Sequence, residues 1–111
     1  MSDATYVVGI TTTDSEEAAE TLAAGLVRDE LAACVQISSP IKSFYRWEGA
    51  VQTDTEWQLW IKTTGELAEV VTSWIREHHS YDVPELVFLP VTAGNPDYLK
   101  WITNETRSSQ P

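Results

Sequence analysis

The chain contains little of three things that often narrow a protein's function: cysteine, basic residues and long apolar runs. Its single cysteine, Cys34, excludes an internal disulfide and a zinc site built on paired cysteines. Only 7 basic residues stand against 17 acidic ones, a formal charge of −10 that disfavours nucleic acid as a partner. No apolar run approaches the roughly 18 residues of a membrane span, and residues 1–3 do not begin a signal peptide. We therefore predict a cytoplasmic protein that binds no membrane.

The sequence also lacks the motifs of common enzymes. It has no glycine-rich phosphate loop, no paired-carboxylate motif and no recognisable set of nucleophile, base and orienting residue. The 111 residues, 42% of them hydrophobic, suffice for one core. We predict a single domain over residues 1–111 that is not an enzyme, has no catalytic residues and requires no cofactor.

A long β-hairpin is the most informative feature present. Apolar residues alternate along residues 33–47 and again along 55–62, and Glu48-Gly49 supplies the turn between them. Such an arm is on the order of 45 Å long, whereas a compact chain of this size has a radius of gyration of about 13 Å. The hairpin should therefore extend beyond its own domain. Pro40 cannot donate to a ladder, so a bend is expected at residues 38–40.

A protruding hairpin exposes aromatic rings and unpaired backbone groups, which soluble proteins cover or pair. We expect other copies of the chain to provide that cover. Aromatic side chains at strand spacing more often pack in an interface than line a ligand groove. The predicted interface residues are Phe44, Tyr45, Trp47, Trp57 and Trp60.

The remaining pattern completes a ferredoxin-like order of elements. The expected elements are a strand over 6–11, a helix capped by Thr13 or Asp14 with its apolar stripe over 18–27, the hairpin, a helix from 64 to about 78, a strand over 85–91, a helix from Asn95-Pro96 and a frayed tail over 107–111. This order predicts an α+β, ferredoxin-like βαββαβ sandwich with both main helices on one face of the sheet. The long hairpin and a C-terminal helix are additions to it.

Five blocks, in this order and spacing, resemble the signatures of the CutA divalent-cation-tolerance family. They are AACVQI at 32–37, YRWEG at 45–49, EWQLWIKTT at 56–64, HSYDVPEL at 79–86 and YLKWI at 98–102. The resemblance covers nearly the whole chain, from about Tyr6 to Trp101. It implies a tight cytoplasmic homotrimer with a role in tolerance of copper and other divalent metals. It also implies an overall likeness to the trimeric PII-type nitrogen regulators.

Candidate site residues gather in the stretch after the second helix. His79 offers an imidazole, Tyr81 a phenol and Glu85 a carboxylate, on backbone that Pro84 keeps irregular. We predict that His79 and Glu85 hold a divalent cation and that Tyr81 lies in the same cleft. A capping or interface hydrogen-bond cluster is the alternative. The family's usual His-Pro-Tyr is His-Ser-Tyr here, so one rigid residue is missing.

Two further residues have open roles. Cys34 is a further candidate metal ligand, but on a predicted internal strand a free cysteine usually behaves as a small buried hydrophobe. One thiolate and one imidazole also leave a soft-metal site short of ligands unless subunits combine. Lys62 either receives an anion in the cleft or is a surface charge.

The sequence thus predicts a homotrimeric protein of divalent-metal tolerance and homeostasis. We expect it to bind Cu(II) or another divalent cation weakly, near a cleft between subunits. One alternative is a PII-like signalling trimer that binds a small anionic metabolite in that cleft. Another is a non-catalytic assembly partner of a second protein.

Overall fold

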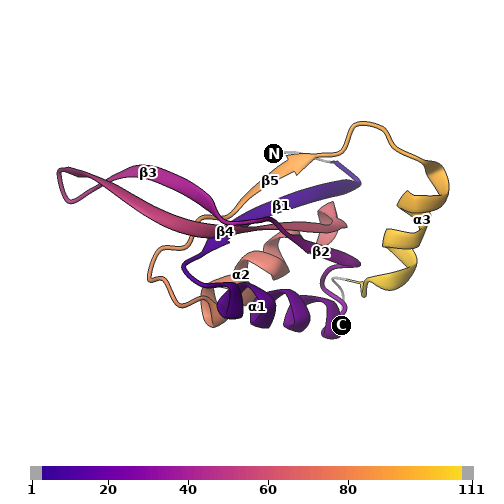
Figure 1. Ribbon diagram of the computed structural model, residues 1–111. Helices are drawn as coiled ribbons and strands as arrows, with labels where there is room; N and C mark the ends of the chain where they lie inside the picture. Colours follow the sequence, from indigo (N-terminus) through magenta and orange to yellow (C-terminus); the bar gives the residue numbers. More distant parts are fainter. Residues whose placement is uncertain (1–3, 109–111) are drawn as a thin grey trace.

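The structure is a computed structural model that describes residues 4–108. Its elements follow the predicted order, with the first arm of the hairpin divided in two (Figure 1). They are β1 (Tyr6–Thr13), α1 (Glu16–Arg28), β2 (Cys34–Ile37), β3 (Ile41–Trp47), β4 (Ala50–Thr64), the 3₁₀ turn η1 (Gly65–Leu67), α2 (Ala68–His78), β5 (Val87–Pro90) and α3 (Pro96–Glu105). Residues 1–3, where no signal peptide is expected, and the end of the predicted frayed tail lie outside this range. Within it, no helix is long and apolar enough to cross a membrane.

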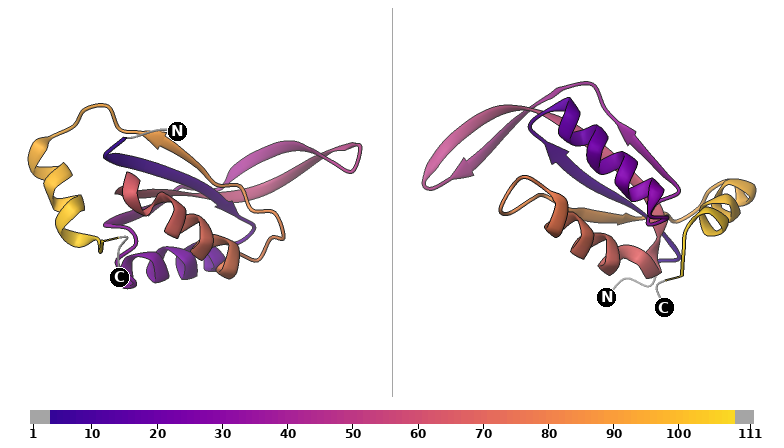
Figure 2. Two further views of the ribbon diagram at one scale, coloured as in Figure 1. Left: turned by 180° about the vertical axis from the view of Figure 1, so that it is seen from behind. Right: turned by 90° about the horizontal axis from the view of Figure 1, so that it is seen from below.

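An antiparallel sheet in the order β2-β4-β1-β5 forms the centre of the domain. β4 pairs with the whole of β1, from Tyr6 opposite Thr64 to Thr13 opposite Trp57. α1 and α2 lie together on one face of the sheet, and α3 lies at the end opposite the hairpin (Figures 1 and 2). The ferredoxin-like arrangement is confirmed.

β3 and the first half of β4 form a two-stranded ribbon, residues 41–56, that extends beyond the rest of the domain (Figure 1). The longest dimension of the molecule is accordingly 43 Å, against 26 Å in the other two directions. At the tip, Glu48 and Gly49 both have positive φ, 49° and 81°, so the turn places a non-glycine residue in the left-handed region as well. The protruding hairpin and the break before Ile41 are confirmed.

The core lies between the sheet and the pair of helices. Leu59 and Ile61 on β4 point to the helix side because alternate strand residues share a face. Each fully buried aliphatic side chain contributes about 1.5–3 kcal/mol relative to an exposed one. The buried core cluster comprises Ala19, Leu22, Leu26, Leu31, Ala32, Leu59, Ile61, Leu67, Val71 and Ile75.

The predicted cap of the first helix is wrong. α1 is capped by Ser15, whose Oγ accepts a hydrogen bond of 3.1 Å from the backbone N–H of Ala18. Thr13 still belongs to β1, and its hydroxyl donates to the carbonyl oxygen of Ser15 at 2.8 Å. The strand therefore extends two residues further than the apolar run indicated, which moves the cap along the chain.

Two other local predictions are also corrected. β2 is an edge of the sheet rather than an internal strand, so Cys34 is only half-buried. β5 covers Val87–Pro90 rather than residues 85–91, because Glu85 and Leu86 still belong to the irregular segment that follows Pro84. The first correction concerns which strands lie side by side, and the second concerns where a strand begins and ends. The alternation of apolar residues shows neither.

Candidate functional site

The loop between α2 and β5, residues 79–86, contacts the base of the ribbon. α2 ends at His78, and His79 adopts extended backbone with φ −77° and ψ 145°. The loop meets Glu56, the first residue of β4 beyond its last pair with β1, Thr13–Trp57. Two distant parts of the sequence thus come together where the ribbon leaves the sheet.

Both ring nitrogens of His79 are engaged by backbone groups. Nε2 lies 2.7 Å from the carbonyl oxygen of Thr12, and Nδ1 lies 3.0 Å from the backbone nitrogen of Tyr81. Because a carbonyl can only accept and an amide N–H can only donate, Nε2 carries a hydrogen and Nδ1 accepts. The side chain is 9% exposed. His79 therefore fixes the loop to β1, and a metal could reach Nδ1 only by displacing the Tyr81 amide.

Tyr81 connects the loop to the ribbon. Its hydroxyl donates to Oε2 of Glu56 at 2.8 Å, and Glu56 is only 8% exposed. Desolvation by burial is the main cause that raises the pKa of Tyr81, followed by the hydrogen bond and the charge of Glu56. The phenol therefore keeps its proton at physiological pH and remains a donor to the carboxylate.

Glu85 interacts with the same carboxylate. Burial raises the pKa of Glu85, the negative charge of Glu56 raises it further, and a hydrogen bond with Thr12 lowers it. The residue as a whole is exposed, so solvent screens part of this effect. In the described part of the chain the one ion pair joins Arg28 and Asp29. Neither carboxylate at the ribbon base thus has a basic partner there.

This arrangement offers oxygen donors to a cation. Two carboxylates and the Thr12 hydroxyl are ligands that hard divalent cations prefer, whereas imidazole suits copper and zinc. Within residues 4–108, a single protomer does not gather three or more His, Cys, Asp or Glu side chains suited to a metal. A full set of ligands would need water molecules or another subunit.

The other two predicted site residues lie elsewhere. Cys34 and Lys62 are opposite each other on β2 and β4. Lys62 is six residues from Glu56 along the strand, or about 20 Å at ~3.3 Å per residue. Its Nζ donates to Oε1 of Gln36 at 2.8 Å and lies 5.8 Å from the centre of the Tyr98 ring. The structure therefore brings His79, Tyr81 and Glu85 together, but neither Cys34 nor Lys62 joins them within one protomer.

The predicted interface residues divide into two groups. Phe44, Tyr45 and Trp47 on the ribbon are 69%, 41% and 55% exposed, and Trp60 on the sheet face away from α1 and α2 is 38% exposed. Trp57 instead packs against the core cluster. Four of the five side chains are thus exposed on the protomer, and Trp57 is mainly a core residue.

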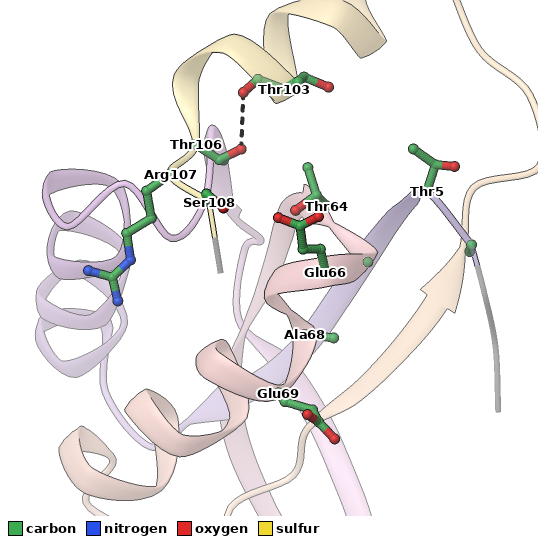
Figure 3. Close-up of a pocket in the computed structure, with 11 residues that line it drawn as sticks. Thr5, Thr64, Glu66, Ala68, Glu69, Thr103, Thr106, Arg107 and Ser108 are labelled. Carbon is green, nitrogen blue, oxygen red and sulfur yellow. Dashed lines mark hydrogen bonds between the residues drawn. The ribbon is translucent and has the colours of Figure 1, made fainter. Parts of the chain in front are cut away.

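A cavity lies at the opposite end of the sheet, between the start of α2 and the end of α3 (Figure 3). It has a volume of about 810 Å³, and Thr5, Thr64, Glu66 and Thr106 are among its lining residues. The Arg107 side chain points away from Thr64 and Glu66 (Figure 3). None of the predicted site residues lines this cavity. Its volume by itself does not make it the functional site.

Sequence reasoning missed Glu56 and Thr12 as members of the site. Glu56 stands in one of the family-like blocks, but its role depends on where β1 stops pairing with β4. Only the register of the two strands shows that Glu56 stands at the base of the ribbon.

Removing the Glu85 charge should stabilise the protein at neutral pH. Because folding raises the pKa of Glu85, its contribution to stability is fully present below the unfolded pKa and is lost as pH rises through the folded pKa. Thermal melting of Glu85→Gln at pH 7 should therefore give a higher melting temperature than that of the wild type. Near the unfolded pKa of about 4 the difference should disappear. Glu20→Gln, an exposed change on α1, serves as the control, and an equal increase in both variants would contradict the argument.

The family model described as CutA1 divalent ion tolerance protein matches residues 7–105. A chloroplastic CutA 1 from rice is 45% identical over 103 residues, 93% of this chain and 58% of that protein. The divalent-cation tolerance protein CutA of Thermus thermophilus is 42% identical over 99 residues, 89% of this chain and 96% of that one. The chain therefore spans little more than half of the rice protein but nearly all of the bacterial one.

Solved structures show the same likeness. The crystal structure of CutA1 from rice has a TM-score of 0.91 at 43% identity and covers 94% of this chain and 95% of that one. A structure from Archaeoglobus fulgidus, described as a periplasmic divalent cation tolerance protein, has a TM-score of 0.88 at 36% identity and covers 90% and 97%. By sequence and by fold, the chain belongs to the CutA1 divalent ion tolerance protein family.

Proposed function

We propose that this protein acts in divalent-cation tolerance as a homotrimer that binds a divalent cation weakly near a cleft between subunits. Cu(II) is one candidate cation, and the protein catalyses no reaction. The observation that carries the proposal is the carboxylate pair Glu56 and Glu85, which interact at the ribbon base without a basic partner in the described chain. The cytoplasmic location is inferred from the sequence alone, since the relatives named above include chloroplastic and periplasmic proteins.

The exposed apolar surface supports the assembly. The ribbon displays Phe44, Trp47 and Val51, the last of them 65% exposed, and the sheet face opposite α1 and α2 displays Trp60 and Leu89. A soluble protein usually covers patches of this kind. Copies of the same chain, arranged with closed symmetry, would cover both surfaces and would bring ribbon bases close to neighbouring subunits.

The carboxylate pair supports a cation rather than an anion as the ligand. Burial and the charge of Glu56 both raise the pKa of Glu85, and a cation between the two carboxylates would offset the repulsion between them. The formal charge of −10 also attracts cations and repels anionic metabolites. Lys62, the candidate anion ligand, instead donates to Gln36 outside this site. Because one protomer offers two carboxylates and an engaged imidazole, weak binding is expected.

Glu85→Gln should weaken cation binding. We expect calorimetric titration with Cu²⁺, and separately with Mn²⁺, to show at least a roughly tenfold loss of affinity, as for the removal of a charged ligand worth about 1.4 kcal/mol. Glu20→Gln should bind as the wild type does. Equal affinities for the wild type and Glu85→Gln would exclude the carboxylate pair. An absence of binding by the wild type would favour the assembly-partner alternative.

A further inference from the structure

The ribbon has little support from the sheet. The last pair of β4 with β1 is Trp57–Thr13, and the last pair with β2 is Leu59–Ile37. From Glu56 to the tip, β4 pairs only with β3 in the described chain. Two-stranded ribbons are marginally stable and strongly twisted when nothing else holds them. Within one protomer, the direction of the ribbon therefore depends on contacts at its base.

Two such contacts lie on opposite edges of that base. On the β2 side, Gln58 and Ser38 are joined twice: the Ser38 N–H donates to the Gln58 carbonyl oxygen at 2.8 Å, and the Ser38 hydroxyl oxygen accepts from the Gln58 N–H at 3.0 Å. On the other side, the Tyr81 hydroxyl bonds to Glu56 at 2.8 Å. The first contact is within the hairpin, whereas the second joins it to a separate loop.

Tyr81 is itself firmly placed. Its backbone N–H bonds to His79, and its ring lies 4.7 Å from the His79 ring, centre to centre. His79 in turn bonds to Thr12, one residue before the last β1 pair. The chain of contacts from β1 through His79 and Tyr81 to Glu56 thus connects the sheet to the ribbon outside the strand ladder.

We propose that the loop 79–86 is a strap: the Tyr81–Glu56 hydrogen bond fixes the direction in which the ribbon leaves the sheet, and a divalent cation at Glu56 acts on the ribbon through this bond. Tyr81 is a positioning residue in this scheme. The cation part rests on the proposed function, while the strap itself does not. The Tyr81 hydroxyl and the cation would share the Glu56 carboxylate. Cation binding would therefore change the strength of the Tyr81–Glu56 hydrogen bond, and loss of that bond would change the affinity for the cation.

Hydrogen exchange of the full chain tests the strap without metal. In Tyr81→Phe, the amides at the ribbon base, residues 41–44 and 53–56, should exchange about tenfold faster, as expected when a hydrogen bond to a charged acceptor is lost. Tyr6→Phe is the matched control, because its hydroxyl contacts Thr103 at the other end of β1 and its removal should leave these amides unchanged. If these amides exchange at the same rate in Tyr81→Phe and in the wild type, the proposal that the loop acts as a strap is wrong.

The variant Glu56→Gln distinguishes the effect of the Tyr81–Glu56 hydrogen bond from the effect of the cation. Its amide oxygen still accepts from Tyr81, so protection without metal should stay close to that of the wild type, whereas any effect of Mn²⁺ should be lost. In the wild type, saturating Mn²⁺ should change exchange at the same amides. Measured Mn²⁺ binding without such a change overturns the link between cation and ribbon. An absence of Mn²⁺ binding counts against the proposed function, and the metal-free comparison still decides the strap.

Discussion

Replacing both Phe44 and Trp47 by serine should convert the proposed trimer into single, folded protomers. Both side chains are more than half exposed on the protomer, so the substitutions remove little from its own core. In the proposed trimer they would be buried, at about 2 kcal/mol each. Losing about 4 kcal/mol per protomer corresponds to a roughly thousandfold weaker association.

Sedimentation velocity at micromolar concentration would measure this change, with circular dichroism to confirm that the protomer stays folded. Val27→Ser on α1 provides the control, because Val27 is also an exposed apolar residue, at 44%, but lies away from the ribbon. A double variant that sediments with the wild type would exclude the ribbon as the main interface. A wild type that sediments as one protomer would exclude the trimer altogether.

Gly65→Ala should lower the melting temperature by roughly 10 °C or more, for a loss of about 3 kcal/mol. A Cβ at this position would lie 1.9 Å from the carbonyl oxygen of Ala4. The Gly65 N–H also donates to the Thr5 carbonyl oxygen at 2.8 Å, so the start of η1 and the segment entering β1 are held in close backbone contact. Backbone cannot rotate away as a side chain can, so the overlap must separate the two segments.

Thermal unfolding at a fixed protein concentration would test this prediction. Gly94→Ala is the matched control, because the atoms nearest to its Cβ would belong to the Leu99 side chain, from 3.3 Å, and that side chain can adjust. A Gly65→Ala protein that melts with the wild type would show that residues 4 and 5 move aside without cost.

Periodicity predicted most of the fold because burial imposes it directly. Trp57, Leu59 and Ile61 alternate since β4 has the helices on one face only, and the spacing of Leu67, Val71 and Ile75 follows from one face of α2 against that sheet. The same pattern does not show which strand lies beside which. For this reason the sequence predicts β2 inside the sheet, whereas β2 is an edge strand. The pattern also does not show where a strand ends: β1 continues to Thr13, so the cap of α1 is Ser15.

The clustering of His79, Tyr81 and Glu85 could be predicted from the sequence, but the contacts that these residues make could not. The sequence grouped His79, Tyr81 and Glu85 because they are close along the chain. It did not show that backbone groups already occupy both nitrogens of His79, since one of those partners, Thr12, lies 67 residues away. Nor did it show Glu56 as the residue that Tyr81 meets, because that contact depends on strand register.

Because the ribbon is long, a small rotation at its base displaces its tip by a large distance. The seven residues of β3 span about 23 Å at ~3.3 Å per residue, so tilting the arm by about 10° would move its tip by ~4 Å. This displacement is close to the spacing of about 4.8 Å between neighbouring strands in a sheet. In the proposed trimer, a sub-ångström adjustment near Glu56 would thus be amplified until the far aromatic rings no longer meet their counterparts on an adjoining subunit.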